Sequence, residues 1–154
     1  MRKISTLLML LHALLVPAQA PMDSTVLQYC RERNAQAMTQ YGNGEYDLAT
    51  ECFKELAGLG YPPAITNLGI AYMNGTGIWQ SSKKALACFS KAAMLDEPTA
   101  QMHLGTMYAR GIGTEMNDSA AIYWFTKLAD QGNTKAMNKI AFIYLNGKPS
   151  RQTA

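Results

Sequence analysis

Apolar residues recur along this chain at helical spacing, and the whole pattern repeats every 36 residues. Within each repeat, an Ala, a Leu or Ile, and a Tyr stand at positions i, i+4 and i+8, which is one face of an α-helix. Three helices are therefore expected, at about residues 64–74, 100–110 and 136–146. Their repeated positions are Ala64, Leu68 and Tyr72; Ala100, Leu104 and Tyr108; and Ala136, Ile140 and Tyr144.

A second apolar stripe follows each of the first two expected helices at the same offset, and an equivalent stripe precedes them. It predicts a partner helix in each unit, with Ser81 or Ser82 and Asn117 or Asp118 as N-cap candidates. A long helix over 24–42 should open the array. The pattern thus predicts an all-α protein, a right-handed α-solenoid of about seven helices. The repeated positions of this stripe are Ala49, Phe53 and Ala57; Ala85, Phe89 and Ala93; and Ala121, Phe125 and Ala129.

Two kinds of glycine carry information about packing. Gly75 and Gly111 follow the first two repeated helices and are expected to end them in the left-handed conformation. Gly69 and Gly105 lie inside those helices, where glycine costs about 1 kcal/mol relative to Ala. We therefore expect a close approach by the partner helix at both positions, through Ala85 and its equivalent in the next unit.

Residues 1–20 have the pattern of a secretory signal peptide. Arg2 and Lys3 precede an apolar run over 7–16, which is too short to span a bilayer. The expected cleavage follows Ala18 or Ala20. The remaining chain divides into a solenoid domain over 21–147 and a polar tail over 148–154, and its expected location is the periplasm or the cell exterior.

Charge and cysteines change this picture little. The formal net charge of +3 falls to +1 without the two basic residues of the signal peptide, and no basic run with interleaved aromatics points to nucleic acid. Three cysteines remain, so at least one must be free of an internal bridge. Cys30 and Cys52 form the one pair within a single helical hairpin and are the candidate disulfide, although their positions along the two helices look offset.

Candidate catalytic residues are few. His103 is the one histidine outside the signal peptide, and we expect it to face solvent. Ser81 and Lys84 have the spacing of an acylation motif found in penicillin-binding enzymes, but the companion motifs are missing. We therefore expect no enzyme activity, no catalytic residue, no metal site and no cofactor.

The repeated pattern resembles the Sel-like repeat family, a relative of the tetratricopeptide repeats, over about residues 49–147. The resemblance implies a surface that binds another protein: a component of an envelope complex or a secreted toxin such as a type VI secretion phospholipase, for which this chain would be an inhibitor or immunity protein. The alternative is an enzyme acting on cell-wall or β-lactam substrates, like some cysteine-rich Sel-like proteins. In related repeats, three positions around the repeated leucine point into the concave groove. Here they are Thr66, Ile70 and Met73; Met102, Thr106 and Ala109; and Asn138, Phe142 and Leu145.

Overall fold

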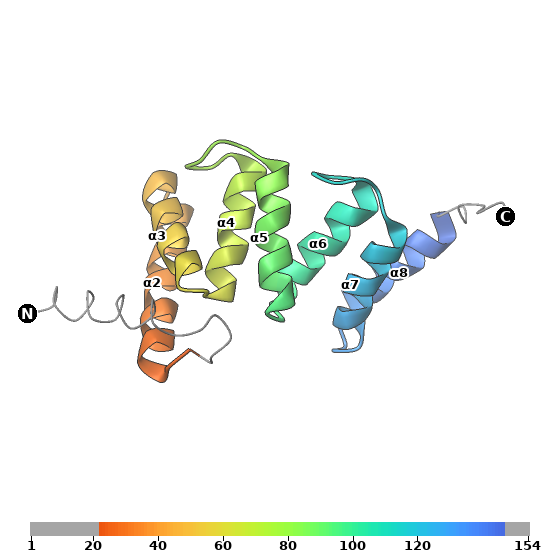
Figure 1. The fold of residues 1–154 in the computed structure, drawn as a ribbon, viewed down its shortest axis with the longest axis horizontal. Helices are drawn as coiled ribbons and strands as arrows, with labels where there is room; N and C mark the ends of the chain where they lie inside the picture. The colour runs from red at the N-terminus through yellow and green to blue at the C-terminus, as the bar shows by residue number, and fades with distance from the viewer. Residues whose placement is uncertain (1–21, 147–154) are drawn as a thin grey trace, which may run out of the picture.

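Among residues 22–146, seven helices follow one another in a single row, as three antiparallel hairpins and a final helix (Figure 1). The computed structural model describes residues 22–146, and within them there is no strand. The expected signal peptide and polar tail lie outside the described residues. The helices are α2 (Ser24–Gly42), α3 (Tyr46–Gly58), α4 (Pro62–Asn74), α5 (Ser82–Met94), α6 (Pro98–Arg110), α7 (Asp118–Ala129) and α8 (Thr134–Asn146).

Local sequence signals account for the helix ends. The Ser81 hydroxyl accepts the backbone N–H of Lys84 at the start of α5, and the Asn117 amide oxygen accepts the N–H of Ala120 at the start of α7. Gly75 ends α4 at φ +70° and Gly111 ends α6 at φ +64°, in the left-handed region that glycine adopts without strain. The expected solenoid of helical hairpins is confirmed.

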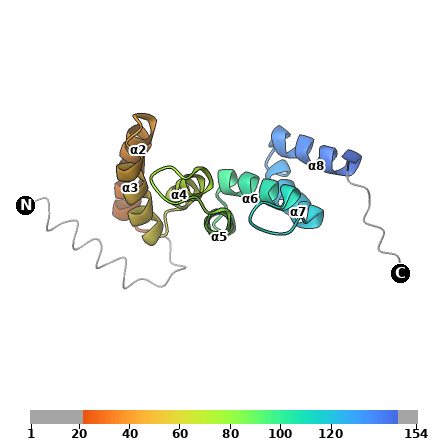
Figure 2. The ribbon, with the colours of Figure 1, turned by 90° about the horizontal axis from the view of Figure 1, so that it is seen from above.

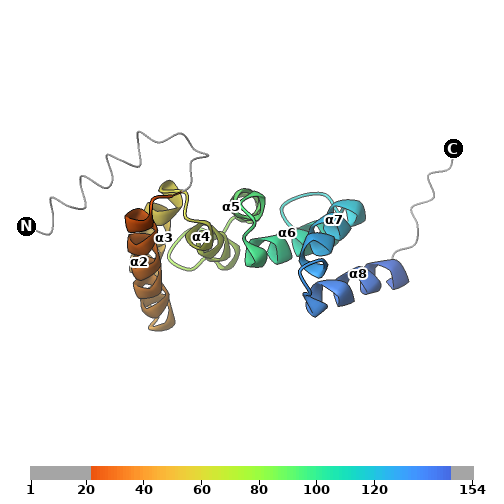
Figure 3. The same ribbon diagram turned by 90° about the horizontal axis from the view of Figure 1, so that it is seen from below.

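Each helix makes its main contacts with its neighbours in the row, and weaker contacts reach further, as where the Asn67 amide of α4 donates to Asn34 of α2 at 3.1 Å. Figures 2 and 3 show the row from above and from below, with the α2–α3 hairpin at one end and α8 at the other. The helices α3, α5 and α7 each lie between two others, so they contribute to two interfaces at once. Such a stack has no single central core, and each unit's stability depends on the next one.

A phenylalanine–glycine contact fixes the spacing within the two central hairpins. A Cβ atom added to Gly69 would lie 2.8 Å from the ring of Phe89, and one added to Gly105 would lie 2.6 Å from the ring of Phe125. Both rings are buried. The two glycines are therefore retained because an aromatic ring occupies the space of a side chain. The partner expected from the sequence, Ala85, was the wrong residue of α5.

The loops between paired helices reach back over the preceding unit. Gly113, at φ +70°, sits against the carbonyl oxygen of Ser82, 2.6 Å from where its Cβ would be. Gly77, which lies 36 residues before Gly113 and has φ +66°, sits in the same way against the carbonyl oxygen of Tyr46. Both the close approach and the positive φ exclude a side chain at these two glycines. Each loop therefore packs its own hairpin directly against the backbone of the hairpin before it.

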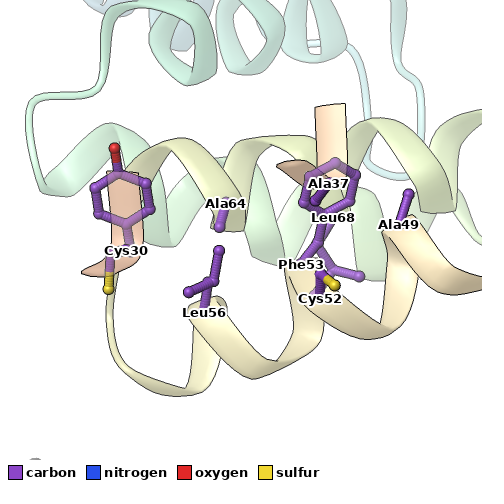
Figure 4. Packing of buried hydrophobic residues seen from close by; sticks show 9 residues of the cluster. Cys30, Ala37, Ala49, Cys52, Phe53, Leu56, Ala64 and Leu68 are labelled. Atoms are coloured by element: carbon purple, nitrogen blue, oxygen red, sulfur yellow. The ribbon is translucent and has the colours of Figure 1, made fainter. Parts of the chain in front are cut away.

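The cysteines are free thiols, so the Cys30–Cys52 disulfide considered from the sequence is wrong. In Figure 4 Leu56 and Ala64 lie between the two sulfur positions. The Cys52 thiol faces the side-chain oxygen of Gln40 at 3.8 Å, and burial raises the pKa of Cys30 to about 11. The two thiols fill different parts of the first apolar cluster as small hydrophobic groups.

Gly105→Leu should destabilise the protein by about 1–3 kcal/mol, because the new side chain overpacks the contact with Phe125. The matched control is Gly58→Leu, at the end of α3, where an added Cβ meets no atom within 4 Å. Chemical denaturation measures both. Equal unfolding free energies for the two variants would show that the ring does not need the glycine.

Candidate functional site

The nine groove positions expected from the sequence fall into two groups. Thr66 is buried, and its hydroxyl lies 2.9 Å from Oε2 of Glu97, the carboxylate that caps α6. The expectation that Thr66 lines an open groove is therefore wrong, since it ties α4 to the next unit. Ile70 and Met73 are half-buried and pack into the cluster formed by α4, α5 and α6.

The second set repeats this arrangement one unit later. Met102 and Ala109 are half-buried and pack against the cluster of α7 and α8. The Thr106 hydroxyl donates to the carbonyl oxygen of Met102 at 2.8 Å within α6. This face of a repeated helix is thus covered by the helices that follow it, so these positions stabilise the stack.

The third set is exposed, because no described helix follows α8. Phe142 is 65% exposed and Leu145 is 84% exposed, and Asn138 beside them is also exposed. The structure therefore separates the nine residues by their place in the row, although they occupy equivalent positions in the repeat.

A second exposed face of α8 lies beside this one, and the sequence analysis did not single it out. Ala141 stands at the repeat position of Gly69 and Gly105, and Tyr144 at that of Tyr72 and Tyr108. Tyr144 is 70% exposed and Met137 is 46% exposed. The repeat offset itself was the available signal, since it aligns these residues with positions that α5 and α7 cover.

Together the two faces form one apolar surface, which we call the α8 surface; Figures 2 and 3 show α8 at the end of the row with its outer side open. The inner side of α8 holds the helix in place through Ala136, which is buried, and through Ile140 and Ile143. The sequence of α8 contains Lys135 and Lys139 and no acidic residue. The α8 surface consists of Met137, Asn138, Ala141, Phe142, Tyr144 and Leu145.

Apart from the α8 surface, a hollow of about 530 Å³ lies between α2 and α3. Its lining includes Arg33, Glu51 and Glu55. Its carboxylates already have partners. Lys54 pairs with Glu51 at 2.6 Å, and Tyr29 donates to Glu55 at 2.5 Å. Burial and the Glu55 carboxylate raise the pKa of Tyr29 to about 12. We therefore regard this hollow as part of the solvated surface of the first hairpin.

The candidate catalytic groups have structural roles in this fold. The Ser81 hydroxyl caps α5, and the Lys84 ammonium lies over the ring of Tyr72, 5.4 Å from its centre. His103, expected at the surface, is half-buried and stacks on Phe89 with the ring centres 4.6 Å apart. No cluster of three or more potential metal ligands occurs among residues 22–146. Within the same residues, no helix has the length and apolar character needed to cross a membrane.

These features define an α-solenoid repeat protein, and comparison with known proteins gives its family. The Sel1 repeat model matches residues 62–97, 98–133 and 134–153, so the chain belongs to the Sel1 repeat family. The first two matches coincide with the α4–α5 and α6–α7 hairpins, and the third begins with α8. No curated protein shows significant sequence similarity to the chain.

Solved structures agree with this assignment. A protective antigen present in uropathogenic Escherichia coli strains, described as displaying an SLR fold, is 28% identical over 77% of this chain and 26% of its own, with a TM-score of 0.70. A Sel1 repeat protein from Oxalobacter formigenes is 29% identical over 75% of this chain and 47% of its own, with a TM-score of 0.68. Helicobacter pylori cysteine rich protein B shares the fold, with 24% identity, a TM-score of 0.55, and coverage of 58% and 68% of the respective chains.

The chain therefore spans less than half the length of the first two structures. A Sel1-repeat solenoid is consistent with a scaffold that binds other proteins.

Met102→Ala should lower the unfolding free energy by about 1–2 kcal/mol, because it removes packing between two units. Phe142→Ala, one repeat later and exposed, should change it by less than about 0.5 kcal/mol. Denaturant titration compares them. If Phe142→Ala unfolds the protein as readily as Met102→Ala, then α8 is covered in solution by something that this structure does not contain.

Acid should weaken the fold through His103. Burial lowers the pKa of His103 below its ordinary value of 6.5, although the Glu97 carboxylate opposes the shift. The unfolded chain therefore binds the proton more readily, and stability should fall as the pH drops below about 6.5. Unfolding midpoints at pH 7.5 and 5.5 measure this loss. His103→Asn, which introduces the residue found at the equivalent position 67, should remove part of the difference; an unchanged difference would place its origin elsewhere.

Proposed function

We propose that this chain is an exported, non-enzymatic adaptor that binds another protein through the α8 surface. One observation carries the proposal: Phe142, Tyr144 and Leu145 are 65–84% exposed on one helix. The equivalent residues of α4 and α6 are all half-buried in the stack. Exposed aromatic and aliphatic side chains that lie together mark protein-binding surfaces more often than scattered ones do.

The proposal of export rests on the N-terminal sequence. Arg2, Lys3 and the apolar run over 7–16 match a signal peptide, and processing after Ala18 or Ala20 would release the repeat domain into the periplasm or the medium.

The absence of enzyme activity is proposed from what the candidate groups do. Ser81 is engaged as a helix cap, and Lys84 lies over Tyr72, so neither is arranged as an acylation pair with the other. The adaptor has two forms that differ in the partner: a resident component of an envelope complex, or a secreted toxin that the chain inhibits as an immunity protein.

Capture of partners from a periplasmic extract tests the proposal. The variant Phe142→Ala combined with Leu145→Ala should weaken capture of the principal partner, by about 1–2 kcal/mol for each residue that is a hot spot. Trp79→Ala is the control, because Trp79 is 93% exposed on the loop between α4 and α5, far from α8 in the row. The captured protein then identifies the form of the adaptor.

The proposal would be contradicted if Trp79→Ala abolished capture while the α8 variant retained it. N-terminal sequencing of the same preparation checks export: the mature chain should begin at Gln19 or Pro21. A chain that still begins at Met1 and stays in the cytoplasm would contradict the proposed location.

A further inference from the structure

The two complete hairpins show what normally covers the open side of a helix such as α8. The helix α5 covers α4, and α7 covers α6, each placing a phenylalanine ring on a glycine. On α8 the same register holds Ala141, with Tyr144 beside it, and both are exposed. The α8 surface is therefore an established helix–helix interface of this repeat with one of its two helices missing from the described residues.

In repeat register, the residues that follow α8 in the printed sequence align with a connection between two helices. Because α5 begins at Ser82 and α7 at Asp118, the repeat offset places the start of the next covering helix at residue 154. Residues 147–154 correspond in register to the connections at 75–82 and 111–118.

A second copy of the chain has no free helix of the required kind. The candidates are α3, α5 and α7, and each already lies between two neighbours in its own row. Releasing one of them would expose buried rings such as Phe89 and Phe125. The uncovered helix of a second copy is α8 itself, which contains Lys135 and Lys139 and no acidic residue, so pairing two α8 helices would bring like charges together. A helix from a different protein is therefore the occupant that these observations favour.

We propose that the α8 surface binds an amphipathic helix of a partner protein, which packs where the next covering helix of the repeat would lie. This inference rests on the proposed function and specifies the partner's chemistry. Its apolar stripe should follow the i, i+4, i+7 spacing that Ala121, Phe125 and Leu128 show in α7. Acidic residues beside the stripe would complement Lys135 and Lys139.

Ala141 restricts the central residue of that stripe. In the α6–α7 hairpin, a Cβ on Gly105 would lie 2.6 Å from the Phe125 ring. Ala141 carries that Cβ, so a phenylalanine cannot approach α8 as closely as Phe125 approaches α6. The partner helix should therefore present a residue smaller than phenylalanine, such as leucine, opposite Ala141.

Two helix-stabilised peptides test this selectivity directly. The first has the α7 sequence, residues 118–129; the second carries Phe125→Leu in the same sequence. Both are titrated by fluorescence anisotropy against the full chain and its Ala141→Gly variant, with helix content checked by circular dichroism. The unchanged chain should bind the leucine peptide about fivefold more tightly or better, and Ala141→Gly should shift the preference toward the phenylalanine peptide by a similar factor.

Phe142→Glu should weaken binding of both peptides by at least tenfold, roughly the loss of one hot spot. Trp79→Ala should leave binding unchanged. The inference is overturned if neither peptide binds, if the chain and Ala141→Gly show the same preference, or if sedimentation reveals a dimer that Phe142→Glu dissociates. Failure of the peptides together with loss of a captured partner on Phe142→Ala would reject the helical occupant and leave the proposed function standing.

Discussion

The contact between a buried phenylalanine and a glycine of the preceding helix determines how this solenoid is built. Phe89 meets Gly69 of α4 on one side and stacks on His103 of α6 on the other. One ring thereby joins a hairpin internally and joins it to the next unit. Because the ring fills the place of a side chain, it sets the distance between helix axes, and a 36-residue offset in sequence becomes a fixed step in space.

The same contact explains why the end of the row differs from its middle. In the middle of the row, α4 and α6 are each covered by a phenylalanine ring on one side and by the next hairpin or helix on another. The last described helix, α8, keeps only its inner contacts through Ala136, Ile140 and Ile143. Its other apolar positions are still those of the repeat, so they remain hydrophobic where they face solvent. The α8 surface thus follows from the repeat pattern and the place of α8 in the row.

Much of the fold could be predicted because its signals are local. Helix period, the N-caps Ser81 and Asn117, and the terminal Gly75 and Gly111 depend on residues a few positions apart, and the predicted long first helix matches α2 (Ser24–Gly42). The site was harder to predict. Periodicity places Thr66 and Phe142 on the same helix face, but only the arrangement of neighbouring helices decides that Thr66 is buried and Phe142 exposed. The ring that meets Gly105, and the separation of Cys30 from Cys52, depend on that same arrangement.

The size of the α8 surface limits how tightly it can bind alone. Full burial of an exposed Phe, Tyr or Leu side chain contributes about 1.5–3 kcal/mol, so the three largest residues supply roughly 5–9 kcal/mol. Association costs about 4–15 kcal/mol in lost freedom of motion, before side chains are ordered. The balance is a weak contact at best. A stable complex must therefore use further surface along the row, and the exposed side chains of Tyr123 in α7 and of Met116 in the loop before α7 are large apolar groups in the neighbouring unit.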